Sequence, residues 1–115
     1  MRVLGSKGED LAVKFLRKKG YLIIERNYKT NLGEIDIIAR EGSTFIFVEV
    51  KTRSNDSYGF PFEAVGSKKR HKMRNLALNY MRRRGSEFPV RFDVISIFCA
   101  NGRREIVHIK DAFEV

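Results

Sequence analysis

The sequence is poor in the residues that cross-link or anchor a protein. Its 115 residues include one cysteine, two histidines and two prolines. Cys99 alone cannot form an internal disulfide, and no His/Cys spacing suits a structural zinc ion. No apolar run approaches the roughly 20 residues that span a bilayer, and no secretion signal is evident. We therefore expect a cytoplasmic protein with no membrane association.

Acidic residues are also scarce. Lys and Arg number 23 against 14 Asp and Glu, which gives a net charge of +9. Such an excess favours a polyanionic partner, usually nucleic acid, although a ribosome-associated or merely basic protein would share it. Nine Phe, four Tyr and a hydrophobic fraction of 43% can supply a core. Without repeats or linkers, we expect one domain over residues 1–115.

Hydrophobic periodicity predicts two helices and five strands. The first helix spans 6–19, with Ser6 as N-cap and Gly20 as stop. The other expected elements are strands at 21–29, 33–40 and 43–53, a loop at 53–66, a helix at 67–84, and strands at 90–100 and 104–110. The order α-β-β-β-α-β-β indicates an α/β domain with a central mixed five-stranded sheet flanked by helices.

Charged residues interrupt two of these strands, in GEIDIIAREGSTFIFVEVKTR. Alternation along a strand places Glu34, Asp36 and Ile38 on one face, and likewise Glu49 and Lys51. Three turns could join the strands. A two-residue loop starting at Gly42 places Asp36 opposite Glu49 and Glu34 opposite Lys51. Starting the loop one residue earlier keeps the acids on one face, whereas a three-residue loop separates them.

Two opposed carboxylates repel each other unless one takes up a proton or a cation lies between them. Oxygen ligands suit Mg²⁺ or Mn²⁺, so Asp36 and Glu49 are candidate metal ligands, with the Val50 carbonyl as a further oxygen. Lys51 would lie beside the ion and orient or help deprotonate a water. Such a site is typical of phosphodiester hydrolysis. The alternative is a Glu34–Lys51 ion pair, with Asp36 and Glu49 in solvent.

These residues resemble the PD-(D/E)XK nuclease signature, with Asp36 followed by Glu49-Val50-Lys51. Together with SKKRHKM and RFDV, they make the chain similar to the YraN-type (UPF0102) family of small bacterial endonuclease-like proteins. More distantly it resembles archaeal Holliday-junction resolvases. The resemblance implies a restriction-endonuclease-like fold and a nuclease acting on DNA, including branched or junction DNA. Cutting both strands of a junction would require a homodimer. Ile35 stands where the signature has proline.

In the resolvase-like pattern an acid of the first helix joins the metal site, and Glu9 is the matching residue. A capping box, Ser6-Lys7-Gly8-Glu9, explains Glu9 equally well without a metal. Gly8 is a poor residue for a helix whose only local requirement is stability. Glu9 therefore stays a candidate third ligand.

Basic residues dominate the second expected helix. Cations at its start oppose the helix dipole, so we expect phosphate contacts there; the alternative is a solvated face. The candidate nucleic-acid-binding residues are Lys68, Lys69, Arg70, Lys72 and Arg74. Arg53 is a supporting candidate for the scissile phosphate, and Glu34 for the ligands. The Tyr58–Phe62 loop either stacks on bases or plugs the core.

Three other polar residues have structural interpretations. Asp93 is expected to pair with a basic residue, and Cys99 to be a core side chain. His71 and His108 are isolated in the sequence and do not resemble ligands. The functional hypotheses are a metal-dependent endonuclease, a non-catalytic nucleic-acid-binding protein, or a protein-interaction role.

Overall fold

The structure is a computed structural model that describes residues 3–54, 67–100 and 102–112. Its elements follow the expected order. They are α1 (Val3–Lys18), β1 (Leu22–Thr30), β2 (Gly33–Glu41), β3 (Thr44–Ser54), α2 (Ser67–Arg84), β4 (Val90–Ala100) and β5 (Arg103–Ile109).

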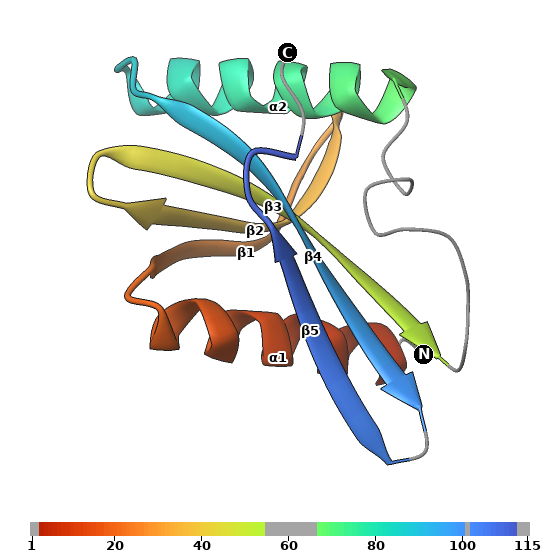
Figure 1. Cartoon of the computed structure of the whole chain (residues 1–115). Helices are drawn as coiled ribbons and strands as arrows, with labels where there is room; N and C mark the ends of the chain where they lie inside the picture. Colours follow the sequence, from red (N-terminus) through yellow and green to blue (C-terminus); the bar gives the residue numbers. More distant parts are fainter. Residues whose placement is uncertain (1–2, 55–66, 101, 113–115) are drawn as a thin grey trace.

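The strands form one mixed sheet in the order β1-β2-β3-β4-β5. All neighbours are antiparallel except β3 and β4, which run parallel. A parallel pair needs a long crossover, and α2 lies in the segment between these two strands. The two helices lie on opposite sides of the sheet (Figure 1). The expected α/β architecture is confirmed.

Each face of the sheet carries its own hydrophobic cluster. The α2 face combines Phe45, Phe47 and Phe92 with residues of α2, including Leu76 and Tyr80. The α1 face combines further strand residues with the helix side chains Ala12, Val13 and Leu16. Because both faces are covered, the central strands consist largely of apolar residues. Charged side chains buried on these strands therefore need specific partners.

Helix α1 starts earlier than expected, at Val3 instead of Ser6. Ser6 consequently lies inside the helix, and the capping-box explanation of Glu9 is wrong. Gly8 has a packing role, because a Cβ at this position would overlap Thr52 Oγ1 of β3. Glycine allows the helix backbone to approach the strand closely. The helix thus passes directly over β3 at the residue next to Lys51.

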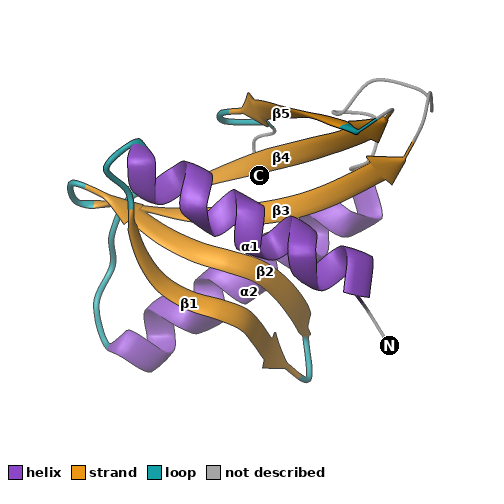
Figure 2. Ribbon diagram, turned by 90° about the horizontal axis from the view of Figure 1, so that it is seen from below, coloured by secondary structure: helices purple, strands orange, loops and turns teal. Residues whose placement is uncertain are grey.

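The β2–β3 hairpin forms the first of the three alternative turns. Glu41 pairs with Thr44 around Gly42-Ser43, and Gly42 has φ 61°, as the first position of a type II′ loop requires. The pairing then stops at Ile37 and Val48. Beyond this point residues 33–35 pair only with β1, and residues 49–54 only with β4. We call this divergence of β2 from β3 the fork (Figure 2).

Strand alternation breaks at the start of the fork. Ile35 and Ile38 lie in the α2 cluster, whereas Ile37 lies in the α1 cluster. The expectation that Glu34, Asp36 and Ile38 share one face is therefore wrong. On β1, Asn27 adopts a left-handed φ of 53° beside the position of Asp36 in the ladder. Asparagine tolerates that conformation better than most residues, and the irregularity redirects both strands.

Candidate functional site

Asp36 lies at the start of the fork and is half-buried. Its Oδ2 accepts a hydrogen bond of 2.8 Å from the backbone N–H of Val50. The carboxylate thereby takes the place of the strand carbonyl that the interrupted ladder no longer supplies. The carbonyl of a strand residue points to the same side as its N–H, so the Val50 carbonyl also faces β2. One carboxylate and one carbonyl are thus directed into the fork.

The surroundings of Asp36 disfavour its charge. Burial, followed by the negative charge of Glu49, raises the pKa of Asp36 to about 6. The hydrogen bond from Val50 opposes this rise, Glu9 adds to it, and Lys69 reduces it. The negative charges of Glu49 and Glu9 both act on Asp36, so the three acids face one region. A cation there would relieve their repulsion.

Glu49 is the most heavily ion-paired acid of the fork. It is buried, with 6% of its surface exposed. Its Oε2 lies 3.3 Å from Lys51 Nζ and also 3.3 Å from Lys69 Nζ. Lys51 is on the same strand, whereas Lys69 reaches across from the first turn of α2. Two ammonium groups therefore share one carboxylate oxygen.

Glu9 approaches from the opposite layer of the molecule. It is 5% exposed, and its Oε1 lies 4.0 Å from Arg26 Nη2 of β1. Arg26 makes a closer contact of 2.6 Å with Asp10. Helix α1 thus brings an acid to one side of the fork, while α2 brings Lys69 to the other.

The donor chemistry of the fork fits a hard divalent cation. Asp36, Glu49 and the Val50 carbonyl are oxygen ligands of the kind Mg²⁺ and Mn²⁺ prefer. Within the described part of the chain, however, no three Asp, Glu, His or Cys side chains gather closely enough to hold a metal as they stand. Glu9 does not complete such a group, and Glu49 is directed to two lysines.

The structure separates Glu34 from this site. Glu34 forms an ion pair of 3.8 Å with Lys29 of β1. The alternative ion pair of Glu34 with Lys51 does not form, because the strands have diverged before they reach these two residues. Arg53 remains beside the site on β3, where it is half-buried and pairs with Phe98 of β4 in the ladder.

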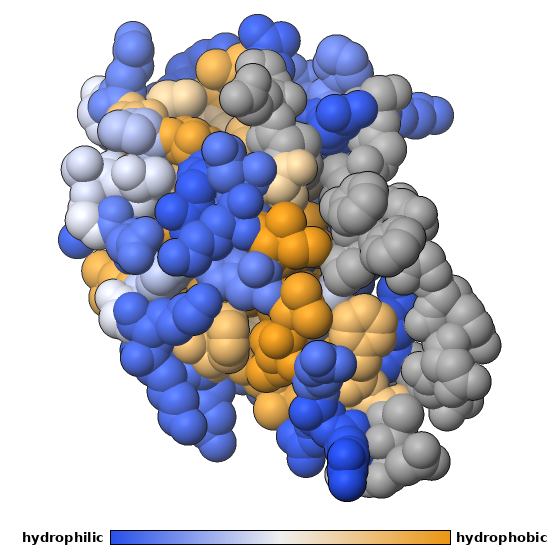
Figure 3. Space-filling model, viewed as in Figure 1, coloured by the Kyte–Doolittle hydropathy of each residue, from blue (hydrophilic) through white to orange (hydrophobic). Residues whose placement is uncertain are grey.

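The basic side chains of α2 divide into two groups. Lys69 is directed to Glu49, whereas the other four nucleic-acid-binding candidates are exposed: Lys68, Arg70, Lys72 and Arg74. On the face seen in Figure 3, hydrophilic residues predominate at the edges, including the top, and a hydrophobic patch lies in the middle. The Tyr58–Phe62 loop lies outside the described residues. Sequence reasoning assigned Lys69 to phosphate alone, although its unfavourable place at a helix start already indicated an acidic partner.

A second polar network joins β4, β5 and the end of α1. Asp93 is fully buried and accepts hydrogen bonds of 2.9 Å from Arg91 and of 2.8 Å from His108 Nε2. The expected structural role of Asp93 is confirmed. Burial opposes ionisation, but the hydrogen bonds from His108, Arg91 and the Asp111 N–H lower the pKa of Asp93. His108, expected to be isolated, also lies 3.1 Å from Lys19 Nζ.

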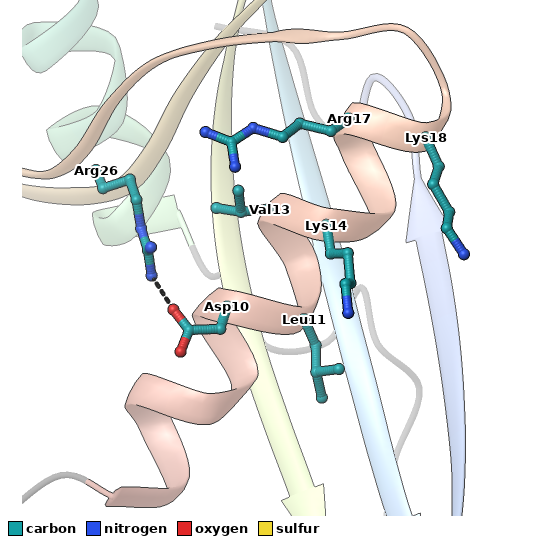
Figure 4. A pocket seen from close by; sticks show the side chains of 7 residues that line it. All are labelled: Asp10, Leu11, Val13, Lys14, Arg17, Lys18 and Arg26. Atoms are coloured by element: carbon teal, nitrogen blue, oxygen red, sulfur yellow. Dashed lines mark hydrogen bonds and ion pairs between the residues drawn. The ribbon is translucent and has the colours of Figure 1, made fainter.

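A groove of about 510 Å³ lies along α1, next to β1. Figure 4 shows Arg17 extending over Val13 in the direction of β1, and the Arg26 side chain running from β1 to its contact with Asp10. The acidic fork residues Asp36 and Glu49 do not line it. Sequence reasoning did not identify this groove, because it arises only when α1 packs beside β1.

The fold and the fork define a class of protein. A mixed sheet between two helices, with α-β-β-β-α-β-β order, is the restriction-endonuclease-like α/β fold. No helix within the described ranges has the length and apolar character needed to cross a membrane.

The chain belongs to the Uncharacterised protein family UPF0102, whose model matches residues 8–97. It is 48% identical to a UPF0102 protein of Geobacter metallireducens, over 97% of this chain and 93% of that protein. It is 46% identical to one of Thermodesulfovibrio yellowstonii, over 96% and 95%. A third relative, from Rhodococcus jostii, is 45% identical over 96% and 95%. The matched region contains the whole fork and α2.

Proposed function

We propose that this protein is a metal-dependent endonuclease that hydrolyses phosphodiester bonds of DNA. The observation that supports this most strongly is the convergence of Asp36, Glu49 and Lys51 at the fork, where the sheet opens and the pKa of Asp36 is raised by burial and by the neighbouring Glu49. Such charges would be costly as structure alone. Branched or junction DNA is the proposed substrate, on the strength of the distant resolvase resemblance.

The residues have distinct proposed roles. Asp36 and Glu49, with the Val50 carbonyl, would hold Mg²⁺ or Mn²⁺. When bound, the ion supplies Lewis-acid polarisation of the phosphate and activation of water. Lys51 Nζ, 3.3 Å from Glu49, would orient that water. Arg53 would contact the scissile phosphate, and the exposed cations of α2 would hold the DNA backbone.

The test is a cleavage assay with Mg²⁺ or Mn²⁺ on single-stranded, duplex, flap and four-way-junction DNA. We expect Asp36→Asn and Lys51→Ala each to lower the rate by at least about a hundredfold, the usual scale for removal of a catalytic group. Glu105→Gln, an exposed change on β5, is the matched control and should keep the wild-type rate. Equal activity in wild type, Asp36→Asn and Lys51→Ala would contradict the proposal.

A second candidate is a nucleic-acid-binding protein that keeps the fold without catalysis. The two lysines on Glu49 favour it, because they neutralise an acid that would otherwise repel phosphate. In that case wild type would bind DNA in a salt-sensitive way, Lys51→Ala would bind equally well, and no substrate would be cut. Absence of DNA binding at low salt would contradict both candidates.

A further inference from the structure

We propose that Lys69 is a built-in latch that competes with the divalent cation for Glu49, so that the metal enters the fork only by displacing this lysine. The inference rests on the proposed metal-dependent function and adds a mode of regulation at the same site. We call the contact of Lys69 with Glu49 the lysine latch.

The geometry shows why Lys69 and a metal exclude each other. Lys69 Nζ lies 3.3 Å from Glu49 Oε2, and Lys51 Nζ lies at the same distance from that oxygen. Glu49 is buried, so it has little room for a further cation beside two ammonium groups. Mg²⁺ and Mn²⁺ bind carboxylate oxygens directly, at about 2 Å. A metal on Glu49 would therefore face like-charge repulsion from both lysines.

Of the two lysines, Lys69 is the one that can leave. Lys51 shares a strand and a face with Glu49, so its position is fixed by the β3 backbone. Lys69 belongs to another element and is more exposed, with 38% of its side chain accessible against 29% for Lys51. It also sits in the first turn of α2, where the helix dipole disfavours a cation unless an anion is close. Glu49 is that anion.

The latch also explains why the acids are not assembled into a ready coordination group. With Glu49 held by lysines, no three potential ligands come together anywhere in the ranges that the structure describes. Once Glu49 binds a metal, Lys69 loses its partner, and its ammonium group becomes available to a phosphate on the α2 side. The metal and the nucleic acid would then favour each other's binding through one side chain.

Isothermal titration with Mn²⁺, in the absence of DNA, tests the latch independently of activity. Three variants are compared with wild type: Lys69→Gln, Lys69→Arg and Lys110→Gln. We expect Lys69→Gln to bind Mn²⁺ about two- to fivefold more tightly, the range that loss of one partly exposed ion pair gives. Lys69→Arg keeps the charge and should remain near wild type. Lys110→Gln removes one exposed charge beyond β5 and should also remain near wild type.

The outcomes separate this inference from the proposed function. Equal or weaker Mn²⁺ binding by Lys69→Gln overturns the latch while leaving the metal site intact. An equal gain in Lys110→Gln overturns it too, because net charge would then be the cause. No Mn²⁺ binding in any of the four proteins overturns the metal site and the latch together. Tighter binding confined to Lys69→Gln supports both.

Discussion

At the scale of single residues, Asp36 shows how a local interruption of structure creates chemistry. The β2–β3 ladder ends one pair before it, so its carboxylate replaces a missing strand acceptor and bonds the Val50 N–H. The same interruption leaves it among other acids, with its pKa raised to about 6. The ionised form of Asp36 therefore destabilises the folded protein.

The pH dependence of stability follows from that pKa. An acid whose folded pKa is raised from 3.8 to about 6 binds protons more readily in the folded state. Ionisation of Asp36 therefore lowers the free energy of unfolding. This loss is absent below pH 4, grows between pH 4 and 6, and is constant above pH 6, at about 3 kcal/mol at most. We expect Asp36→Asn, whose amide oxygen can still accept from Val50, to be more stable than wild type at pH 8 by about 1–3 kcal/mol.

Urea denaturation at several values of pH between 4 and 8 measures this difference. The advantage of Asp36→Asn should shrink toward zero by pH 4. Glu105→Gln, an exposed neutralisation on β5, should show no comparable change. An Asp36→Asn protein less stable than wild type at pH 8 would mean that the charge of Asp36 stabilises the fork.

The sequence was enough to identify these site residues, but it did not predict their contacts. Asp36, Glu49 and Lys51 stood out because charges interrupt apolar strands, and the turn signal correctly predicted the Glu41–Thr44 pair of the hairpin. The end of the ladder could not be predicted, because the left-handed backbone at Asn27 and the break in alternation between Ile35 and Ile37 appear only in the folded sheet. For that reason the alternative that paired Glu34 with Lys51 was wrong, and Glu34 pairs with Lys29 instead. Lys69 was expected at phosphate because its contact with Glu49 joins two distant segments.

At the scale of elements, the contact of α1 with β3 determines where Glu9 lies. Gly8 permits the approach, since a Cβ there would overlap Thr52 Oγ1. The sequence identified Gly8 as unusual in a helix, but only the packing reveals the reason. The closeness of this crossing brings Glu9 over the sheet near the fork.

Replacement of Gly8 and Thr52 by alanine, singly and together, tests this contact. We expect Gly8→Ala to lower the free energy of unfolding by about 1–3 kcal/mol, the cost of overpacking a close contact. In a Thr52→Ala background, where the overlapping oxygen is gone, the same change should stabilise the protein by up to about 1 kcal/mol through helix propensity. Thermal and urea unfolding of the four proteins measure both effects. Destabilisation of equal size in the two backgrounds would contradict the packing explanation.

The network around Asp93 connects β4 to β5. Asp93 is fully buried and bonded by Arg91, His108 and the Asp111 N–H. We expect Asp93→Ala to cost about 3–5 kcal/mol, because it leaves the partly buried Arg91 charge without its nearer carboxylate and the Asp111 N–H without its acceptor. Equilibrium unfolding measures the loss. A change below about 1 kcal/mol would show that the network contributes little to stability.

At the scale of the whole molecule, the charge of +9 is distributed over both helical layers. Exposed cations of α2 include Arg70 and Lys72. Each phosphate contact contributes about one unit to the salt dependence of DNA binding. We expect Arg70→Gln and Lys72→Gln each to reduce the slope of log K against log salt by about one.

Fluorescence anisotropy of labelled DNA over a series of salt concentrations measures these slopes. Arg103→Gln, an exposed change on β5, is the control and should leave the slope unaltered. Equal slopes in the control and both α2 variants would move the nucleic-acid surface away from α2, and the groove along α1 would be the next region to examine.

The position of the fork within a hairpin has a consequence for the order of folding. Asp36, Glu49 and Lys51 all lie on β2 and β3, which are adjacent in the chain and can pair as soon as both strands exist. The parallel pairing of β3 with β4, and the docking of α2 that brings Lys69 to Glu49, are contacts between distant segments and form more slowly. During synthesis the β2–β3 hairpin can therefore form before α2 docks, and until then Lys51 of the same strand is the one lysine of the pair that can neutralise Glu49.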